Sequence, residues 1–178
     1  MRRLRKFRKG YGTGSYILRS VRLVDYDRDI ADLRDFVSAK GMLHVQSCQD
    51  AVANGDAYIL VAERDERVIG VAVVHVAARK DMGWEQDGLT ISLMEGTNAY
   101  LANIEVSPGM RGRGIGGALL RQVEEEARRR GKVRIWLHAD GQNAGAHRFY
   151  ERHGWRHERT VHPSWKQGRA SRIYVKKL

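Results

Sequence analysis

A glycine- and arginine-rich segment carries the clearest chemical signal in the sequence. It is Val106-Ser-Pro-Gly-Met-Arg-Gly-Arg-Gly-Ile-Gly-Gly, and it leads directly into a strongly amphipathic helix. Glycines let backbone amides approach a ligand closely, and a helix N-terminus concentrates partial positive charge. Two arginines add guanidinium groups that bind phosphate oxygens in a bidentate manner. The segment therefore predicts a phosphate-binding loop made of Arg111, Gly112, Arg113, Gly114, Ile115, Gly116 and Gly117.

The glycines of this loop also fit the pattern of a dinucleotide-binding loop, although less well. Gly112, Gly114 and Gly117 match the dinucleotide pattern G-x-G-x-x-G, and Asp140 lies near the distance expected for a ribose-binding acid. However, the glycines come several residues after the predicted strand, and only one further strand–helix unit follows, which is too little for a dinucleotide fold. A nucleoside-triphosphate loop is excluded, because no Gly-Lys-Ser/Thr follows. A glycine loop without a ligand remains the structural alternative.

A second segment places a phenol and a small residue on one helix face. Its sequence is Asn143-Ala-Gly-Ala-His-Arg-Phe-Tyr-Glu-Arg-His-Gly-Trp, so Asn143, Ala146 and Tyr150 are spaced i, i+3 and i+7. Ala146 permits close approach to a ligand. The Tyr150 hydroxyl can donate a proton, whereas core packing is the alternative for Phe149 and Tyr150.

Together the two segments resemble the GNAT superfamily of acyl-CoA-dependent N-acetyltransferases. The family pattern Arg/Gln-x-x-Gly-x-Gly/Ala is matched by Arg111, Gly114 and Gly116. The later pattern Asn-x-x-Ala-x-x-Phe-Tyr, followed by Gly-Phe/Trp, is matched from Asn143 to Trp155. The motifs cover residues 99–156, and the predicted element order extends the resemblance to residues 16–178.

The resemblance implies direct acetyl transfer from acetyl-CoA to an amine. The pyrophosphate would bind the amides of Arg111–Gly117, and the pantetheine arm would run along Ile104–Val106, with an amide near Glu105 or Val106 stabilising the oxyanion. The cofactor would also contact Asn143, Ala146 and Phe149. Tyr150 would protonate the departing thiolate. Glu105 is the candidate base, directly or through water, unless it is a solvated strand residue and the amine deprotonates in solvent.

The elements that position these residues predict an α/β fold. Alternating and helical apolar patterns give the order βααβββαβαββ, a single GNAT-like domain with a mixed, mostly antiparallel sheet. We expect a basic, flexible tail at residues 1–14 and the N-acetyltransferase domain at residues 15–178. Strands are expected at residues 16–24, 57–63, 68–77, 99–106, 133–139, 155–161 and 171–177, with a short one at 89–94 inside a long insertion. Helices are expected near residues 25–37, 45–54, 115–130 and 143–152.

The charge distribution bears on the acceptor. The net charge is +11, but residues 1–22 carry +8, residues 23–106 carry −8 and residues 107–178 carry +11. The acidic middle predicts a cationic acceptor, such as a polyamine, an aminoglycoside-like amine or a basic peptide. The candidate substrate-binding residues are Trp84, Glu85 and Asp87, with Asp29, Asp32 and Asp35 adding negative charge from the first helix. The alternatives are a toxin-type acetyltransferase acting on aminoacyl-tRNA, motivated by the basic termini, and a non-catalytic acyl-CoA-sensing module.

The histidines, the single cysteine and the lengths of the apolar runs indicate which cofactors, compartment and partners to expect. Seven scattered histidines and one cysteine make no zinc pattern, and Gly154 and Trp155 interrupt the helix that would align His153 with His157, so we expect no metal. The lone Cys48 and the lack of an apolar core after residues 1–9 favour the cytoplasm. No apolar run is long enough for a membrane partner. The expected partners are acetyl-CoA and an amine; a homodimer is left open, and nucleic acid enters only with the tRNA alternative.

Overall fold

The computed structural model describes residues 16–20, 26–38, 42, 45–46, 48–77, 96–162 and 169–178. The predicted tail, the short strand at 89–94 and the three candidate substrate-binding residues Trp84, Glu85 and Asp87 lie outside these residues. The described elements follow the predicted order, with one 3-10 turn added after the fourth strand. They are β1 (Ile17–Ser20), α1 (Tyr26–Leu33), α3 (Gln49–Asn54), β2 (Ala57–Arg64), β3 (Arg67–His75), β4 (Asn98–Val106), η3 (Pro108–Met110), α5 (Ile115–Arg129), β5 (Arg134–Asp140), α6 (Ala144–Arg152), β6 (Arg156–Val161) and β7 (Ser171–Lys177).

The strands form one seven-stranded sheet in the order β1-β2-β3-β4-β5-β7-β6. β4 and β5 pair in parallel, whereas β1 with β2, β5 with β7, and β6 with β7 pair antiparallel. The predicted α/β class and the mixed, mostly antiparallel sheet are therefore confirmed. The chain divides into two compact units, the first comprising Met1–Val74 and Asn103–Glu125, the second His75–Ala102 and Glu126–Leu178.

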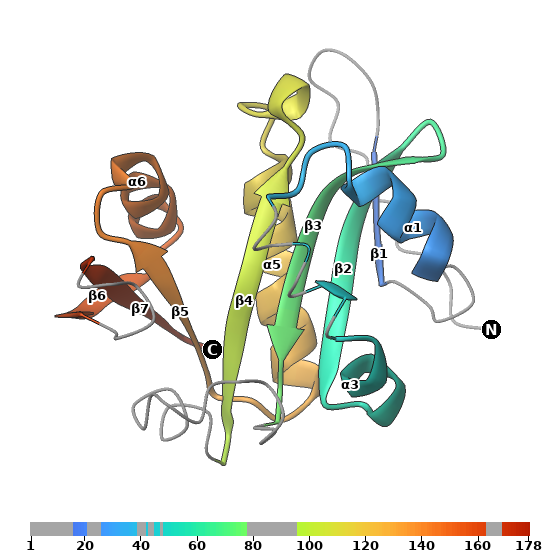
Figure 1. Ribbon diagram of the computed structural model, residues 1–178. Helices are drawn as coiled ribbons and strands as arrows, with labels where there is room; N and C mark the ends of the chain where they lie inside the picture. Colours follow the sequence, from blue (N-terminus) through green and yellow to red (C-terminus); the bar gives the residue numbers. More distant parts are fainter. Residues whose placement is uncertain are drawn as a thin grey trace. The chain divides into compact units, whose positions relative to one another are not determined.

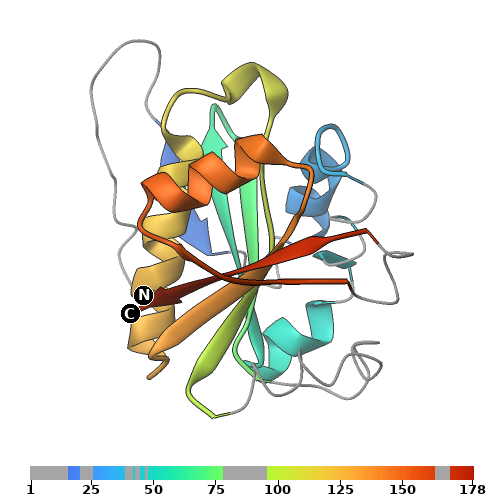
Figure 2. The same cartoon turned by 90° about the vertical axis from the view of Figure 1, so that its left-hand side faces the viewer.

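In the first unit, helices cover both faces of the strands β1–β3. α1 and α3 lie on one face and α5 on the other, as Figure 1 shows from the front and Figure 2 from the side. The buried Tyr58 hydroxyl of β2 donates a hydrogen bond of 2.8 Å to the Val123 carbonyl of α5. A Cβ atom on Gly70 of β3 would lie 3.2 Å from the Leu119 side chain and 3.4 Å from that of Ile115, so this glycine lets the first turns of α5 pack closely against the sheet.

α1 is anchored to the start of β3 by its acidic residues. Asp32 accepts a hydrogen bond of 2.8 Å from the Val68 backbone amide, and Arg67 lies 3.8 Å from Asp32 and 3.1 Å from Asp35. The third acid, Asp29, is buried. Asp32 and Asp35, which the sequence hypothesis placed around the acceptor, thus hold α1 against β3, and Arg67 offsets part of their charge.

The two-residue turn that joins β2 and β3 shows local strain. Its two residues, Asp65 and Glu66, have φ angles of 51° and 62°. Positive φ at both positions matches the right-handed twist of the flanking strands, which is why two-residue hairpins use such turns. Because neither residue is glycine, this turn costs about 1–2 kcal/mol per residue relative to an unstrained backbone.

In the second unit, β5 alternates between a buried and a more open face, with one exception. Ile135, Leu137 and Ala139 are buried on one face, whereas Arg134 is exposed and His138 and Asp140 are half-buried on the other. Trp136 departs from this alternation, since it is only 1% exposed. Its ring centroid lies 4.3 Å from that of Tyr100, its partner in register on β4, so this cross-strand pair buries an aromatic ring on the otherwise open face.

Candidate active site

The predicted phosphate-binding loop has the backbone that its glycines suggested. Gly112 and Gly114 have φ angles of 74° and 79°, in the left-handed region that favours glycine. A Cβ atom on either glycine would meet no other atom within 4 Å, and residues 111–114 are exposed. These glycines are therefore required by the backbone conformation and not by packing.

Two hydrogen bonds fix this loop between β4 and α5. The Arg111 Nε donates to the Val106 carbonyl over 3.0 Å, and the Ala118 amide donates to the Gly114 carbonyl over 3.0 Å. The second bond makes Gly114 the first acceptor of the helix. The amides of Ile115–Gly117 consequently have no acceptor inside the helix, and they concentrate positive charge at its N-terminus. The geometry is suited to binding phosphate oxygens.

The end of β4 brings Glu105 to a partner that the sequence analysis missed. Both of its carboxylate oxygens accept hydrogen bonds from Ser38, one from the hydroxyl over 2.8 Å and one from the backbone amide over 3.0 Å. The neighbours Ile104 and Val106 are half-buried. Ser38 holds the carboxylate in one orientation and leaves the remaining lone pairs for other donors.

α6 begins as the sequence predicted. Asn143 is its N-cap, since the side-chain oxygen accepts a hydrogen bond of 3.0 Å from the Ala146 amide. Phe149 is half-buried and packs against Tyr150, with ring centroids 5.2 Å apart, and against His153, at 4.7 Å. The cofactor contacts predicted for Asn143, Ala146 and Phe149 remain predictions.

Tyr150 is buried between two aromatic rings of the second unit. Its ring centroid lies 5.8 Å from that of Trp155 and 5.7 Å from that of Tyr174. Burial, and to a smaller extent the neighbouring Tyr100, raises the pKa of Tyr150 well above its usual value. Within the described ranges no hydrogen bond to the Tyr150 hydroxyl is formed. The raised pKa keeps the phenol in its neutral, protonated form near neutral pH.

The predicted site residues fall into two groups. The loop and the end of β4 belong to the first unit, as does Ser38, which was not predicted, and the segment from Asn143 to Tyr150 belongs to the second. Among the residues that the structure describes, no group of three or more histidine, cysteine or acidic side chains is arranged to hold a metal ion. In the same part of the chain, no helix is both long enough and apolar enough to cross a membrane.

Comparison with known proteins identifies the class that this fold and loop define. The model of the acetyltransferase (GNAT) family matches residues 27–155, and the chain belongs to that family. It is 44% identical over 54 residues to streptothricin acetyltransferase of Streptomyces lavendulae. That alignment covers 30% of this chain and 29% of the relative, so the chain spans less than a third of the relative's length.

Solved structures agree with the fold. A GNAT-family protein from Desulfovibrio desulfuricans superposes with a TM-score of 0.71 at 20% identity, covering 92% of this chain and 99% of its own. NAA60 of Arabidopsis thaliana in complex with acetyl-CoA superposes with a TM-score of 0.67 at 23% identity, again covering 92% and 99%.

Proposed function

We propose that this chain is an N-acetyltransferase that moves an acetyl group from acetyl-CoA directly to a primary amine. The observation that carries the proposal is the loop of a GNAT-family chain in which two left-handed glycines, Gly112 and Gly114, lead into the N-terminus of α5. Acetyl-CoA is also the ligand named for the structurally similar NAA60. The amides and the guanidinium groups of Arg111–Gly117 bind the pyrophosphate in this proposal.

The end of β4 supplies the reacting centre in the proposed mechanism. The pantetheine arm follows Ile104–Val106, and a backbone amide near Glu105 or Val106 stabilises the oxyanion. The amine nitrogen forms a bond to the acetyl carbon and loses a proton, while the carbon–sulfur bond breaks and the thiolate leaves. Glu105 accepts the amine proton, directly or through water. The Tyr150 hydroxyl is the donor to the departing thiolate.

The Ser38–Glu105 contact gives a way to test the base. In E105Q the amide oxygen still accepts a hydrogen bond from Ser38, but the side chain no longer takes a proton. We expect kcat near neutral pH to fall roughly 100-fold, the lower range for a general base, and to recover as rising pH deprotonates the amine. S38A removes one of the two donors, so kcat should fall only a few-fold. Steady-state rates of CoA release across pH measure both effects.

Acetyl-CoA affinity serves as the control and should stay unchanged in E105Q. Thermal stability should fall slightly in both variants, because each loses one of the two hydrogen bonds between Ser38 and residue 105. Equal losses in E105Q and S38A, with no recovery at alkaline pH, would mean that Glu105 only holds the segment around Ser38. The amine would then deprotonate in solvent.

We propose that the acceptor is cationic. The support is the sequence from Asp81 to Met110, which contains five acids and no lysine or arginine, and includes Glu85 and Asp87. Trp84 adds an aromatic face that attracts a cation. Acidic side chains raise the local concentration of a polyamine or a basic peptide, and this electrostatic attraction weakens as salt screens the charges.

A panel of amines tests the acceptor class. Polyamines, an aminoglycoside, basic peptides, neutral amines and aminoacyl-tRNA are compared by release of the CoA thiol. We expect the cationic amines to be best, their KM to rise with ionic strength, and E85Q/D87Q to raise it further. Preference for aminoacyl-tRNA would favour the RNA-directed alternative. Acetyl-CoA binding with no turnover on any amine would favour the sensing module.

A further inference from the structure

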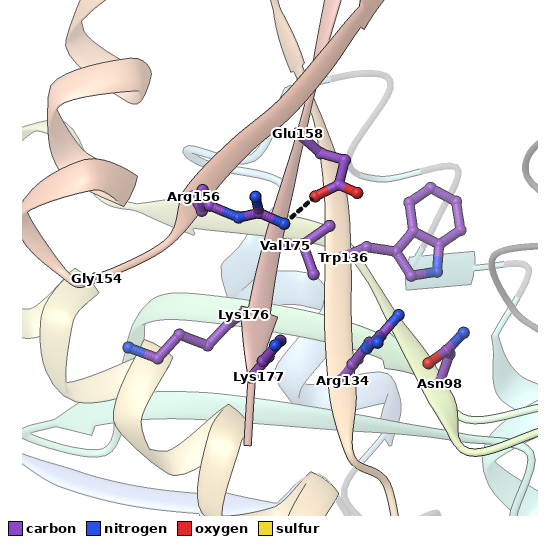
Figure 3. Close-up of a pocket in the computed structure, with 9 residues that line it drawn as sticks. All are labelled: Asn98, Arg134, Trp136, Gly154, Arg156, Glu158, Val175, Lys176 and Lys177. Atoms are coloured by element: carbon purple, nitrogen blue, oxygen red, sulfur yellow. Dashed lines mark hydrogen bonds and ion pairs between the residues drawn. The ribbon is translucent and has the colours of Figure 1, made fainter.

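A second chemical feature lies in the second unit, on residues that the proposed acetyl transfer does not use. It is an open cavity of about 730 Å³, drawn in Figure 3. Its lining residues come from the strands β4, β5, β6 and β7 and from the end of α6: Asn98, Arg134, Trp136, Gly154, Arg156, Glu158, Val175, Lys176 and Lys177.

Three polar side chains form a row across this cavity. Arg134 of β5 is paired in register with Asn98 of β4 on one side and with Lys177 of β7 on the other. Adjacent strands are about 4.8 Å apart, so the row of an amide, a guanidinium and an ammonium spans roughly 10 Å. We call these three residues the donor row.

No acidic side chain among the described residues compensates the charge of the donor row. Four of the lining residues are cationic and only Glu158 is acidic, and Glu158 pairs with Arg156 at 2.6 Å. The Lys176 ammonium donates to the His153 carbonyl over 2.8 Å. Arg134 and Lys177 are both exposed, and over the described residues no acidic group pairs with either of them. Like charges directly opposite on neighbouring strands destabilise a sheet unless an anion lies between them.

A buried donor in the same lining also lacks an acceptor. Trp136 is 1% exposed, and its indole N–H has no hydrogen-bond partner in the described part of the chain. The residues that line this cavity therefore include a cationic pair with no acidic partner in the described part of the chain, and a tryptophan whose buried indole N–H has no acceptor there.

We propose that this cavity binds a phosphorylated small molecule through two adjacent phosphoryl groups on the donor row. Arg134 offers a planar fork that matches phosphate oxygens, Lys177 a point charge and Asn98 a neutral donor. The row of donors spans roughly 10 Å and is therefore longer than a single carboxylate, so two adjacent phosphoryl groups contact more of it. The cavity volume lies within the roughly 300–1,000 Å³ of small-molecule sites, so an organic group fits beside the phosphates.

Free diphosphate and a nucleoside diphosphate both carry two adjacent phosphoryl groups, so both are candidate ligands. Each is titrated into the ¹⁵N-labelled full chain with the acetyl-CoA loop saturated by CoA. The reporter is the Trp136 indole N–H resonance, assigned by its loss in W136F. We expect a saturable shift whose affinity falls with salt. Tighter binding of ADP than of diphosphate identifies a nucleotide as the source, and equal binding identifies the free anion.

R134Q and K177Q should each weaken diphosphate binding roughly tenfold, as expected for the loss of a charge-assisted contact. R121Q is the matched control, because it removes one exposed cation from α5 and should leave the affinity unchanged. No saturable shift, an equal shift in R134Q, or binding of a triglutamate peptide as tight as that of diphosphate overturns the proposal. Because the reporter does not depend on turnover, its failure is separate from any failure of acetyl transfer.

Discussion

Replacing Gly114 by phenylalanine is expected to remove measurable acetyl-CoA binding while the chain still folds. The φ angle of 79° is one that a side chain rarely adopts, yet a Cβ atom there would meet nothing within 4 Å. The free energy of unfolding therefore falls only by the cost of a left-handed backbone, about 1–2 kcal/mol. The ring instead occupies the space where the loop amides face the pyrophosphate. Calorimetry should show an affinity reduced more than about 100-fold, equivalent to the loss of two or more charge-assisted hydrogen bonds.

G55F is the matched control for this experiment. Gly55 has a φ angle of 83° and equally open surroundings, but it ends α3 and is not part of the loop. It should lose a similar amount of stability and keep the wild-type affinity for acetyl-CoA. Unchanged affinity in G114F, or an equal loss in both variants, would contradict the assignment of the pyrophosphate to this loop.

The elements were predictable because their signals are local. The helices expected near residues 115–130 and 143–152, and the strands expected at 57–63 and 68–77, each depend on residues only a few positions apart. The glycine loop was equally visible, since left-handed φ angles require a residue type that the sequence shows directly.

The features that sequence reasoning missed all join residues far apart in the chain. Ser38 and Glu105 are separated by 67 positions, and no local pattern relates them. The donor row exists only because β5 lies between β4 and β7 in the sheet. The burial of Trp136 has the same cause, because the ring it packs against, that of Tyr100, lies on the neighbouring strand and far away in the sequence.

Acidic residues that look alike in the sequence have two different roles: some anchor a helix, and others are proposed to attract the acceptor. Asp32 and Asp35 gave the first helix the same negative charge as the region from Asp81 to Met110, but they are bound to β3. A net charge counted along the sequence does not separate an anchoring carboxylate from one that faces a ligand. The cationic-acceptor proposal therefore depends on the region from Asp81 to Met110 alone.

The second large effect on kcat is expected at Tyr150. The raised pKa of its hydroxyl decides whether it protonates the thiolate or only donates a hydrogen bond to it. A thiolate has an ordinary pKa of about 8.5 and a phenol one of about 10, so complete proton transfer from tyrosine to the thiolate is already unfavourable. Burial raises the pKa of Tyr150 further and makes that transfer still less favourable. We therefore expect Tyr150 to stabilise the departing thiolate by a hydrogen bond while it keeps its own proton, which refines the acid role implied by the family resemblance.

Y150F removes that hydrogen bond and keeps the ring between Trp155 and Tyr174. A hydrogen bond to a charged group contributes about 1.5–3 kcal/mol, so kcat should fall roughly 10- to 100-fold. The affinity for acetyl-CoA should not change, because no charge exists on the sulfur before the transfer. Pre-steady-state acetyl transfer and calorimetry separate the two quantities.

The pH dependence distinguishes a hydrogen-bond donor from an ionising acid. A pKa raised above that of free tyrosine keeps the phenol neutral up to at least about pH 10, so the ratio of wild-type to Y150F kcat should stay constant from about pH 6 to 10. Y174F is the control: its hydroxyl donates to Glu151 over 2.9 Å, and its loss should lower stability by about 1 kcal/mol with kcat unchanged. A ratio that falls steadily above about pH 8 would mean that Tyr150 ionises near the thiol and transfers its proton. Full turnover in Y150F at every pH would mean that the ring only packs, and the thiolate would then take its proton from solvent.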